Sequence, residues 1–116
     1  MKIYVHYNCN SCKKALKWLE ANNIQAETIN LLEQTPSKNE FEQMTEFQEG
    51  NLKKLFNTSG QLYRERGIKD QVKDLSSEDV YQMLSEEGML VKRPFFISEK
   101  AGLLGFKEEL WAETLA

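Results

Sequence analysis

The first third of the chain alternates short apolar runs with one helical stripe. Over 2–6, Ile3 and Val5 alternate with polar or amphipathic residues, which is the period of a half-buried β-strand. Over 11–23 the apolar residues recur every three or four positions, which predicts an amphipathic helix closed by two asparagines. β-Branched residues over 24–31 predict a second strand. A strand, a helix and a strand of these lengths predict a parallel βαβ unit.

The middle of the chain carries the pattern of several helices. Ser37, with Glu40 three residues later, forms a capping box that starts a helix continuing to about residue 48. Ser76 caps another long helix, which Gly88 ends. Asn51 can cap a shorter helix between them, and a further short helix is expected before residue 67. The apolar residues at helical spacing, which we expect in the core, are Phe41, Met44, Phe47, Leu52, Leu55, Phe56, Leu62, Tyr63, Val80, Met83 and Leu84.

The last quarter of the chain predicts a hairpin followed by a helix. A strand is expected over 95–98, directly after Pro94. Residues 99–102 turn the chain, and 103–106 returns as the antiparallel partner. A closing helix is expected over 107–115. Its apolar face would consist of Leu110, Trp111, Thr114 and Leu115.

The length and composition are typical of one small globular domain. A chain of 116 residues can bury one core but not two independent ones. We therefore expect a single domain over 1–116, with a core from 1–36 and 89–116 and a helical insertion over about 37–88. The content of 41% hydrophobic and 28% charged residues agrees with this class.

Membrane and nucleic-acid partners are not expected from the sequence. No run of about 18 apolar residues exists, so no transmembrane helix is expected. The apolar run over 1–5 is too short for a signal peptide, so we expect a cytoplasmic protein. The net charge of −3 at pH 7 argues against direct nucleic-acid binding, which normally needs a basic stripe.

The two cysteines of the chain, Cys9 and Cys12, stand two residues apart where a strand hands over to a helix. A helix N-terminus carries unpaired N–H groups and positive partial charge, which stabilise a thiolate, and Lys13 and Lys14 add positive charge. In such a pair the more exposed N-terminal cysteine attacks a disulfide and the second resolves the mixed disulfide. We therefore expect Cys9 to be the nucleophile and Cys12 the resolver.

Two other interpretations of the cysteine pair compete with this one. A zinc site needs four ligands, but His6 is the only histidine and no second C-x-x-C is present, so we expect no metal. Alternatively, both thiols could be buried and inert, because free cysteine is among the most buried residue types. Cys12 fits that description better than Cys9, because it shares an apolar helical stripe with Ala15, Leu16 and Leu19.

The order of elements and two motifs resemble a known fold and family. A C-x-x-C after the first strand, with a proline just before the third strand, resembles the thioredoxin/glutaredoxin fold. The Arg93–Pro94 dipeptide, the helical insertion and the stretch KLFNTSGQLYRE over 54–65 together resemble the ArsC/Spx family. This family comprises glutaredoxin-linked arsenate reductases, their relatives and the redox-sensing Spx regulators. The resemblance implies an α/β fold: a thioredoxin-like four-stranded mixed sheet, βαβ–ββα, with the insertion between strands two and three.

The resemblance also assigns site residues. Pro94 matches the family's cis-proline beside the active-site cysteine, although an ordinary proline at a strand start is the alternative. Arg93 matches an oxyanion-binding arginine and would stabilise the Cys9 thiolate, although a solvated arginine is the alternative. Asn8 and Asn57 are expected to position the substrate.

The sequence departs from the arsenate reductases that it resembles. They bind the oxyanion with three arginines, but Asn57 stands at the place of the first and Phe106 near the place of the third. Each charge-assisted hydrogen bond to an anion contributes about 1.5–3 kcal/mol, so losing two weakens such binding by orders of magnitude. Only Arg93 remains of the three.

The sequence therefore predicts an ArsC-like thiol–disulfide oxidoreductase that uses Cys9 and Cys12. The expected partner is a disulfide-bearing protein or a low-molecular-weight thiol. No bound cofactor is expected beyond a thiol reductant such as a low-molecular-weight thiol, glutaredoxin or thioredoxin. The alternatives are an Spx-like redox-sensing regulator that binds RNA polymerase and, third, an arsenate reductase of the glutathione/glutaredoxin type.

Overall fold

A mixed sheet of four strands runs through the centre of the protein. The computed structural model describes all 116 residues. The strand order is β2-β1-β3-β4, with β1 parallel to β2, and β3 antiparallel to both β1 and β4. The strands are β1 (Lys2–Val5), β2 (Glu27–Asn30), β3 (Phe95–Ile97) and β4 (Gly102–Leu104). The expected α/β, thioredoxin-like architecture is confirmed.

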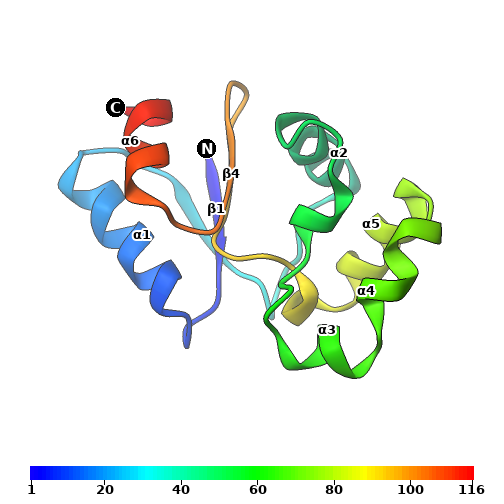
Figure 1. Cartoon of the computed structure of the whole chain (residues 1–116). Coiled ribbons are helices and arrows are strands. Elements are labelled where there is room, and N and C mark those ends of the chain that lie inside the picture. The colour runs from blue at the N-terminus through cyan, green and yellow to red at the C-terminus, as the bar shows by residue number, and fades with distance from the viewer.

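Helices cover both faces of this sheet (Figure 1). One face carries α1 and α6, and the other carries α2 and α5, with α3 and α4 beyond them. The α-helices are α1 (Asn10–Ala21), α2 (Lys38–Phe47), α3 (Gln61–Glu65), α4 (Ile68–Gln71), α5 (Ser77–Glu86) and α6 (Glu108–Leu115). Short 3-10 helices are η1 (Leu52–Leu55), η2 (Val72–Asp74) and η3 (Gly88–Leu90). None of the helices combines the length and the apolarity needed to cross a membrane.

The first strand, β1, contributes side chains to both faces of the sheet. Ile3, Tyr4 and Val5 are all buried. Because successive side chains of a strand point to opposite faces, Ile3 and Val5 face α1 and α6, whereas Tyr4 faces α2. A strand expected to be half-buried is therefore covered on both sides, as is typical when a crossover helix packs on each face.

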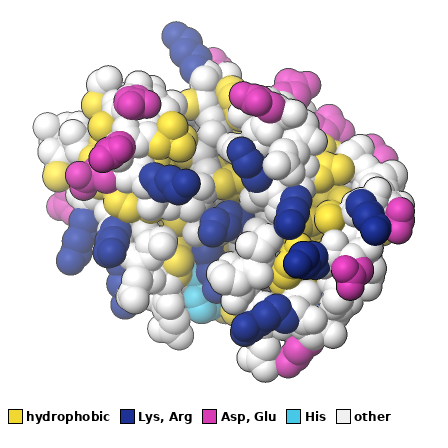
Figure 2. All heavy atoms as spheres, viewed as in Figure 1, with side chains coloured by type: hydrophobic (Ala, Val, Ile, Leu, Met, Phe, Trp, Pro, Cys, Tyr) yellow, Lys and Arg dark blue, Asp and Glu magenta, His cyan; other side chains and the backbone are white.

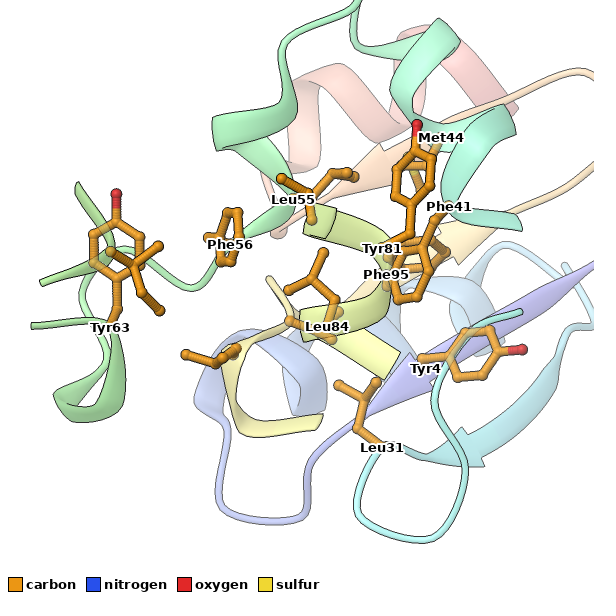
Figure 3. Packing of buried hydrophobic residues seen from close by; sticks show 14 of the residues in the cluster. Tyr4, Leu31, Phe41, Met44, Leu55, Phe56, Tyr63, Tyr81, Leu84 and Phe95 are labelled. Carbon is orange, nitrogen blue, oxygen red and sulfur yellow. The ribbon is translucent and has the colours of Figure 1, made fainter. Parts of the chain in front are cut away.

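The larger apolar cluster lies between the sheet and the helices of 38–90 (Figure 3). Aromatic rings organise it: Phe41 of α2 stacks on Tyr81 of α5 at 6.0 Å between centroids and meets the edge of Phe95 at 5.8 Å. Tyr4 also meets Phe95 edge to face. Such pairs contribute about 0.5–1.5 kcal/mol each beyond the area they bury. This cluster holds α2 and α5 against the sheet.

The smaller cluster lies on the α1 and α6 face of the sheet. As expected, Cys12 and Leu19 of α1 are buried there together with Ala15, and Leu16 packs partly against them. Trp111 of α6 is fully buried, and its indole N–H donates to the Gly105 carbonyl at 3.0 Å. The cluster therefore packs the helix that carries Cys12 directly against the sheet.

The prediction of which α6 residues are buried is partly wrong. Trp111 is buried and Leu115 half-buried, but Leu110 is 45% exposed and Thr114 is exposed. The helix packs along the narrow stripe through Trp111 and Leu115, and only Trp111 of these four residues is fully buried. The pattern overestimated how wide a face the helix buries.

The predicted helix caps are confirmed at both long helices of the middle segment. The Ser37 hydroxyl accepts from the Glu40 N–H at 3.2 Å, and the Glu40 carboxylate accepts from the Ser37 N–H at 3.0 Å, which completes the capping box. Ser76 accepts from the Asp79 N–H at 3.1 Å in the same way. These caps satisfy N–H groups that a helix start otherwise leaves unpaired.

The second strand is shorter than expected. The expectation was 24–31, but β2 covers only Glu27–Asn30. The Ile24 N–H donates to the Leu19 carbonyl at 2.9 Å, so this residue still closes the helix rather than pairing in the sheet. Asn23 adopts the left-handed conformation, φ 57°, as expected of an asparagine at a helix end.

The segment before β3 contains short helices that the sequence did not predict, namely α4, η2 and η3. Gly88 lies in η3, and its φ is not in the left-handed region that a helix-ending glycine uses. Instead, a Cβ there would collide with the Leu31 carbonyl oxygen. Gly88 is thus needed for a close approach of two backbones.

Candidate redox site

Cys9 lies at the N-cap of α1, directly after β1. Its sulfur accepts a hydrogen bond from the Cys12 N–H at 3.2 Å, and its own N–H donates to the His6 carbonyl at 3.3 Å. The sequence predicted a helix start near Ser11, but the helix begins at Asn10 and the thiol itself is the capping group. The sulfur therefore satisfies one of the N–H groups that a helix start otherwise leaves unpaired. The residue is half-buried, unlike Cys12, and packs partly against the smaller apolar cluster.

Cys12 occupies the opposite environment one helical turn later. It is 1% exposed and packs in the smaller apolar cluster. Burial, followed by the neighbouring Cys9 thiol, raises the pKa of Cys12 to about 12. Both cysteines are free thiols in the structure. The alternative in which both thiols are buried therefore describes Cys12 but not Cys9.

Arg93 lies on the same side of the molecule as the two thiols. Its positive charge opposes the rise in the pKa of Cys12. Burial, and after it the charge of Arg93, lowers the pKa of His6. The guanidinium also donates to the Met89 carbonyl at 3.4 Å, which fixes the side chain near the start of β3. Arg93 is half-buried, unlike the fully solvated arginine of the alternative interpretation.

Pro94 has the cis peptide bond that the resemblance implies. The Arg93–Pro94 bond is cis and Pro94 is buried. Its carbonyl accepts from the Gly105 N–H at 3.0 Å. Pro94 is thus built into the start of the β3–β4 hairpin.

Asn57 and Arg93 line one shallow groove of about 310 Å³, together with residues of α3 and Met89. The Asn57 N–H donates to the Leu90 carbonyl at 2.8 Å, and Phe56 forms a bridge with Val91. These bonds hold the segments over 55–58 and 90–93 side by side. The structure therefore brings Asn57 next to Arg93, although they are far apart in sequence.

Asn8 and Phe106 are placed differently from what their proposed roles suggest. Asn8 is exposed, and its main-chain N–H, not its side chain, donates to His6 Nδ1 at 3.2 Å. Phe106 packs with Cys9 against the smaller apolar cluster, and its ring lies 5.2 Å from that of Trp111. An aromatic ring therefore stands where the resemblance implies an anion-binding arginine.

His6 lies near the thiols, although the sequence pattern predicted no role for it because it cannot complete a zinc site. Its carbonyl accepts from Cys9, its imidazole accepts from the Asn8 N–H, and Arg93 acts on it electrostatically. The signal in the sequence was its place between β1 and Cys9. No group of three or more His, Cys, Asp or Glu side chains is arranged to hold a metal ion.

The fold and the site together define a thioredoxin-like protein of a thiol-redox class, with a cysteine pair at the first helix and a cis-proline before the third strand. The chain belongs to the ArsC family, whose model matches residues 4–114.

Individual relatives agree with this assignment over nearly the whole chain. The uncharacterized protein YusI of Bacillus subtilis is 37% identical over 116 residues, which covers 100% of this chain and 98% of YusI. The solution NMR structure of SACOL0876 from Staphylococcus aureus COL is 40% identical with a TM-score of 0.85, covering 98% of this chain and 97% of that one. The global transcriptional regulator Spx of Bacillus subtilis is 26% identical over 107 residues, covering 92% of this chain and 80% of Spx.

Proposed function

We propose that the protein is a thiol–disulfide oxidoreductase in which Cys9 is the nucleophile and Cys12 the resolving thiol. The observation that carries this proposal is the contrast between the two thiols. Cys9 is only half-buried and its sulfur accepts a hydrogen bond from the Cys12 N–H at the start of α1, whereas Cys12 is buried one turn later. A substrate disulfide can therefore reach Cys9 but not Cys12.

The reaction proceeds by two exchanges. The Cys9 thiolate attacks one sulfur of the substrate disulfide, forms a mixed disulfide and releases the other sulfur as a thiolate. Cys12 gives up its proton and attacks the Cys9 sulfur, which releases the second substrate thiolate and leaves a Cys9–Cys12 disulfide. The substrate gains two electrons and the protein loses two. A thiol reductant, either a low-molecular-weight thiol or a glutaredoxin- or thioredoxin-type protein, returns the pair to two thiols.

The remaining site residues have supporting roles in this proposal. Arg93 supplies positive charge that favours the thiolate form of the resolving Cys12 and an anionic leaving group. Asn57 lines the groove beside Arg93 in which the substrate backbone would lie, and Pro94, buried behind Arg93, fixes the chain at the start of β3. The main-chain N–H of Asn8 holds the His6 ring. We place this activity in the cytoplasm, where paired thiols are kept reduced between turnovers.

Trapping of substrates tests the division of work between the two cysteines. Cys12→Ser removes the exit from the mixed disulfide, so this variant should accumulate adducts through Cys9 at about ten times the level in the parent protein or more. Adducts are measured after acid quenching and alkylation of cells, by non-reducing gels and mass spectrometry.

Cys9→Ser is the matched control, because it removes one thiol from the same pair. This variant should trap few partners. Adducts carried by Cys12, or no adducts in either variant while the parent pair resists oxidation, would refute the proposal.

A redox-sensing regulator is the second candidate, and the similarity to Spx over 92% of this chain favours it. In that case the same cysteine pair would switch a contact with RNA polymerase. Recovery of polymerase on the immobilised protein, with a yield that differs between the dithiol and the disulfide forms, would support this candidate over an enzyme.

Arsenate reduction ranks third. The groove beside Arg93 contains Asn57 in place of an arginine, and Phe106 packs into the apolar cluster. Only the Arg93 guanidinium then remains to bind the oxyanion, whereas the resemblance implies three arginines. Weak or absent turnover of arsenate is expected even with glutathione and glutaredoxin supplied.

A further inference from the structure

A second groove, which we call the lysine groove, lies next to the redox site. It has a volume of about 420 Å³ and runs between η1, the residue before Arg93, and the start of α6. Four lysines line it: Lys53, Lys54, Lys92 and Lys107. Figure 2 shows Lys and Arg side chains gathered along the middle of this face, between the two halves of the molecule.

The lysine groove is positively charged without internal compensation. No Asp or Glu lines it, and none of its four lysines takes part in a salt bridge. This contrasts with the protein as a whole, whose net charge is −3 at pH 7. Like charges gathered in one cleft repel one another, so the groove gains stability when a negative partner enters it.

The walls and floor of the lysine groove favour an extended peptide. Phe56, Leu104 and Leu110 add apolar surface, and Leu110 is one of the few large apolar side chains left exposed. The lysines come from three separate segments and lie around the groove, and the groove has no arginine. A compact phosphate is typically held by converging or bidentate donors, whereas dispersed lysines suit several carboxylates along a chain.

The lysine groove and the groove that contains Arg93 are lined by residues adjacent in the chain. Thr58 and Lys92 line the lysine groove, while Asn57 and Arg93 line the other one. The Lys92 N–H donates to the Leu55 carbonyl at 2.8 Å, which fixes these two segments side by side. A chain that lies in the groove beside Asn57 and Arg93 can therefore extend toward the lysines.

We propose that the lysine groove binds an acidic segment of the protein whose disulfide Cys9 attacks. This inference rests on the proposed function and adds the class of substrate: a disulfide flanked by Asp and Glu residues. The positive groove attracts the acidic segment and orients it, and the exchange chemistry at Cys9 and Cys12 is unchanged.

Matched peptide disulfides test this proposal. Two peptides of about ten residues carry one cysteine in a mixed disulfide with a chromophoric aromatic thiol, flanked by four Glu in one and four Gln in the other. Cys9 attacks the peptide sulfur and releases the aromatic thiolate, which is followed by absorbance. At about 20 mM salt the acidic peptide should react about tenfold faster, and at about 0.5 M salt this advantage should fall below about twofold.

Two lysine variants of equal net charge separate the groove from general electrostatics. Replacing all four groove lysines by Gln should abolish the rate advantage of the acidic peptide. A milder double variant, Lys53→Gln with Lys54→Gln at exposed positions, should reduce that advantage at least twofold. The control replaces four exposed lysines outside the groove, Lys17, Lys69, Lys73 and Lys100, by Gln and should keep the full advantage. Equal loss in the control, or equal rates for both peptides at low salt, overturns the proposal.

A third disulfide tests whether the groove prefers phosphate to carboxylates, and a binding measurement tests the groove without the exchange reaction. If a phosphate-bearing low-molecular-weight disulfide gains from the four lysines and the acidic peptide does not, the acidic segment is the wrong ligand. If neither peptide disulfide reacts with the parent protein, the proposed function fails. The groove is then judged by fluorescence anisotropy of a labelled, cysteine-free acidic peptide, whose salt-sensitive binding should disappear in the four-lysine groove variant and persist in the control.

Discussion

At the scale of single residues, the two thiols differ because of one helical turn. Cys9 is the N-cap, before the first turn of α1, so its sulfur faces the N–H groups and solvent. Cys12 already belongs to the stripe that packs on the sheet. The spacing of three residues places both cysteines at the start of the helix but leaves only Cys9 accessible to a substrate.

Selective alkylation checks this difference. At about pH 7.5, iodoacetamide should modify the native protein once, at Cys9, because Cys12 is buried and its pKa is raised to about 12. Mass spectrometry with peptide mapping counts and locates the adducts. In denaturant both thiols should react within the same time, which controls for the reagent. Rapid double modification of the folded protein contradicts the assignment.

At the scale of elements, the start of α2 is tied to β1 through Glu40. One carboxylate oxygen accepts from the Tyr4 hydroxyl at 2.6 Å and from the Ser37 N–H at 3.0 Å, and the other lies 3.3 Å from the Lys2 ammonium. Burial acts to raise the pKa of Glu40, but the bonds from Tyr4, Ser37 and Lys2 outweigh it, so the pKa is lowered.

The pH dependence of stability tests this tie. Because the folded state lowers the pKa of Glu40, its carboxylate stabilises the protein above the ordinary glutamate pKa of about 4.3, and this contribution is lost as the pH falls through the folded value. Glu40→Gln should lower the free energy of unfolding by about 1–2 kcal/mol at neutral pH. Urea titrations at several pH values should show the difference shrinking in acid. A difference that stays constant with pH would exclude the carboxylate as its cause.

The contact between η3 and the end of β2 gives a second test at this scale. Gly88→Ala should destabilise the protein by about 1–3 kcal/mol, because the added methyl group meets the Leu31 backbone, which cannot move as a flexible side chain does. Gly50→Ala is a useful comparison, since φ is +82° there but no atom stands within 4 Å of the new Cβ. Thermal unfolding of both variants measures the two effects. A stable Gly88→Ala protein would show that η3 can shift away from Leu31.

At the scale of the whole molecule, β1 and β3 join the two apolar clusters. Tyr4 and Phe95 belong to the larger cluster, while Ile3 and Phe96, their neighbours in the chain, belong to the smaller one. Neither cluster can lose its packing without exposing a strand that the other also buries. The clusters should therefore unfold together.

Two optical probes test this coupling. Both tryptophans, Trp18 and Trp111, lie at the smaller cluster, so their fluorescence reports the α1 and α6 side. Far-UV circular dichroism also reports the helices of the other side. The two urea transitions should coincide, and Phe41→Ala, in the larger cluster, should lower both midpoints through a loss of about 3–5 kcal/mol. Separate transitions, or a Phe41→Ala effect on one probe only, would show independent units.

The sequence by itself determined the local parts of this protein. Period-two and helical apolar patterns place β1 and α1, the Ser37 and Ser76 caps start α2 and α5, and the C-x-x-C falls where the strand meets the helix. Such features depend on residues a few positions apart, whose spacing follows directly from strand and helix geometry.

Only the tertiary structure decided which distant residues meet. Pairing of the segments over 55–58 and 90–93 brings Asn57 to Arg93 and aligns the lysines of η1 with Lys92, although no local pattern links them. Likewise, Gly88 is needed because Leu31 approaches it, and Leu110 stays exposed because α6 packs on the sheet through Trp111 and Leu115. The physical reason is that packing and charge act through space, whereas periodicity and capping act along the chain.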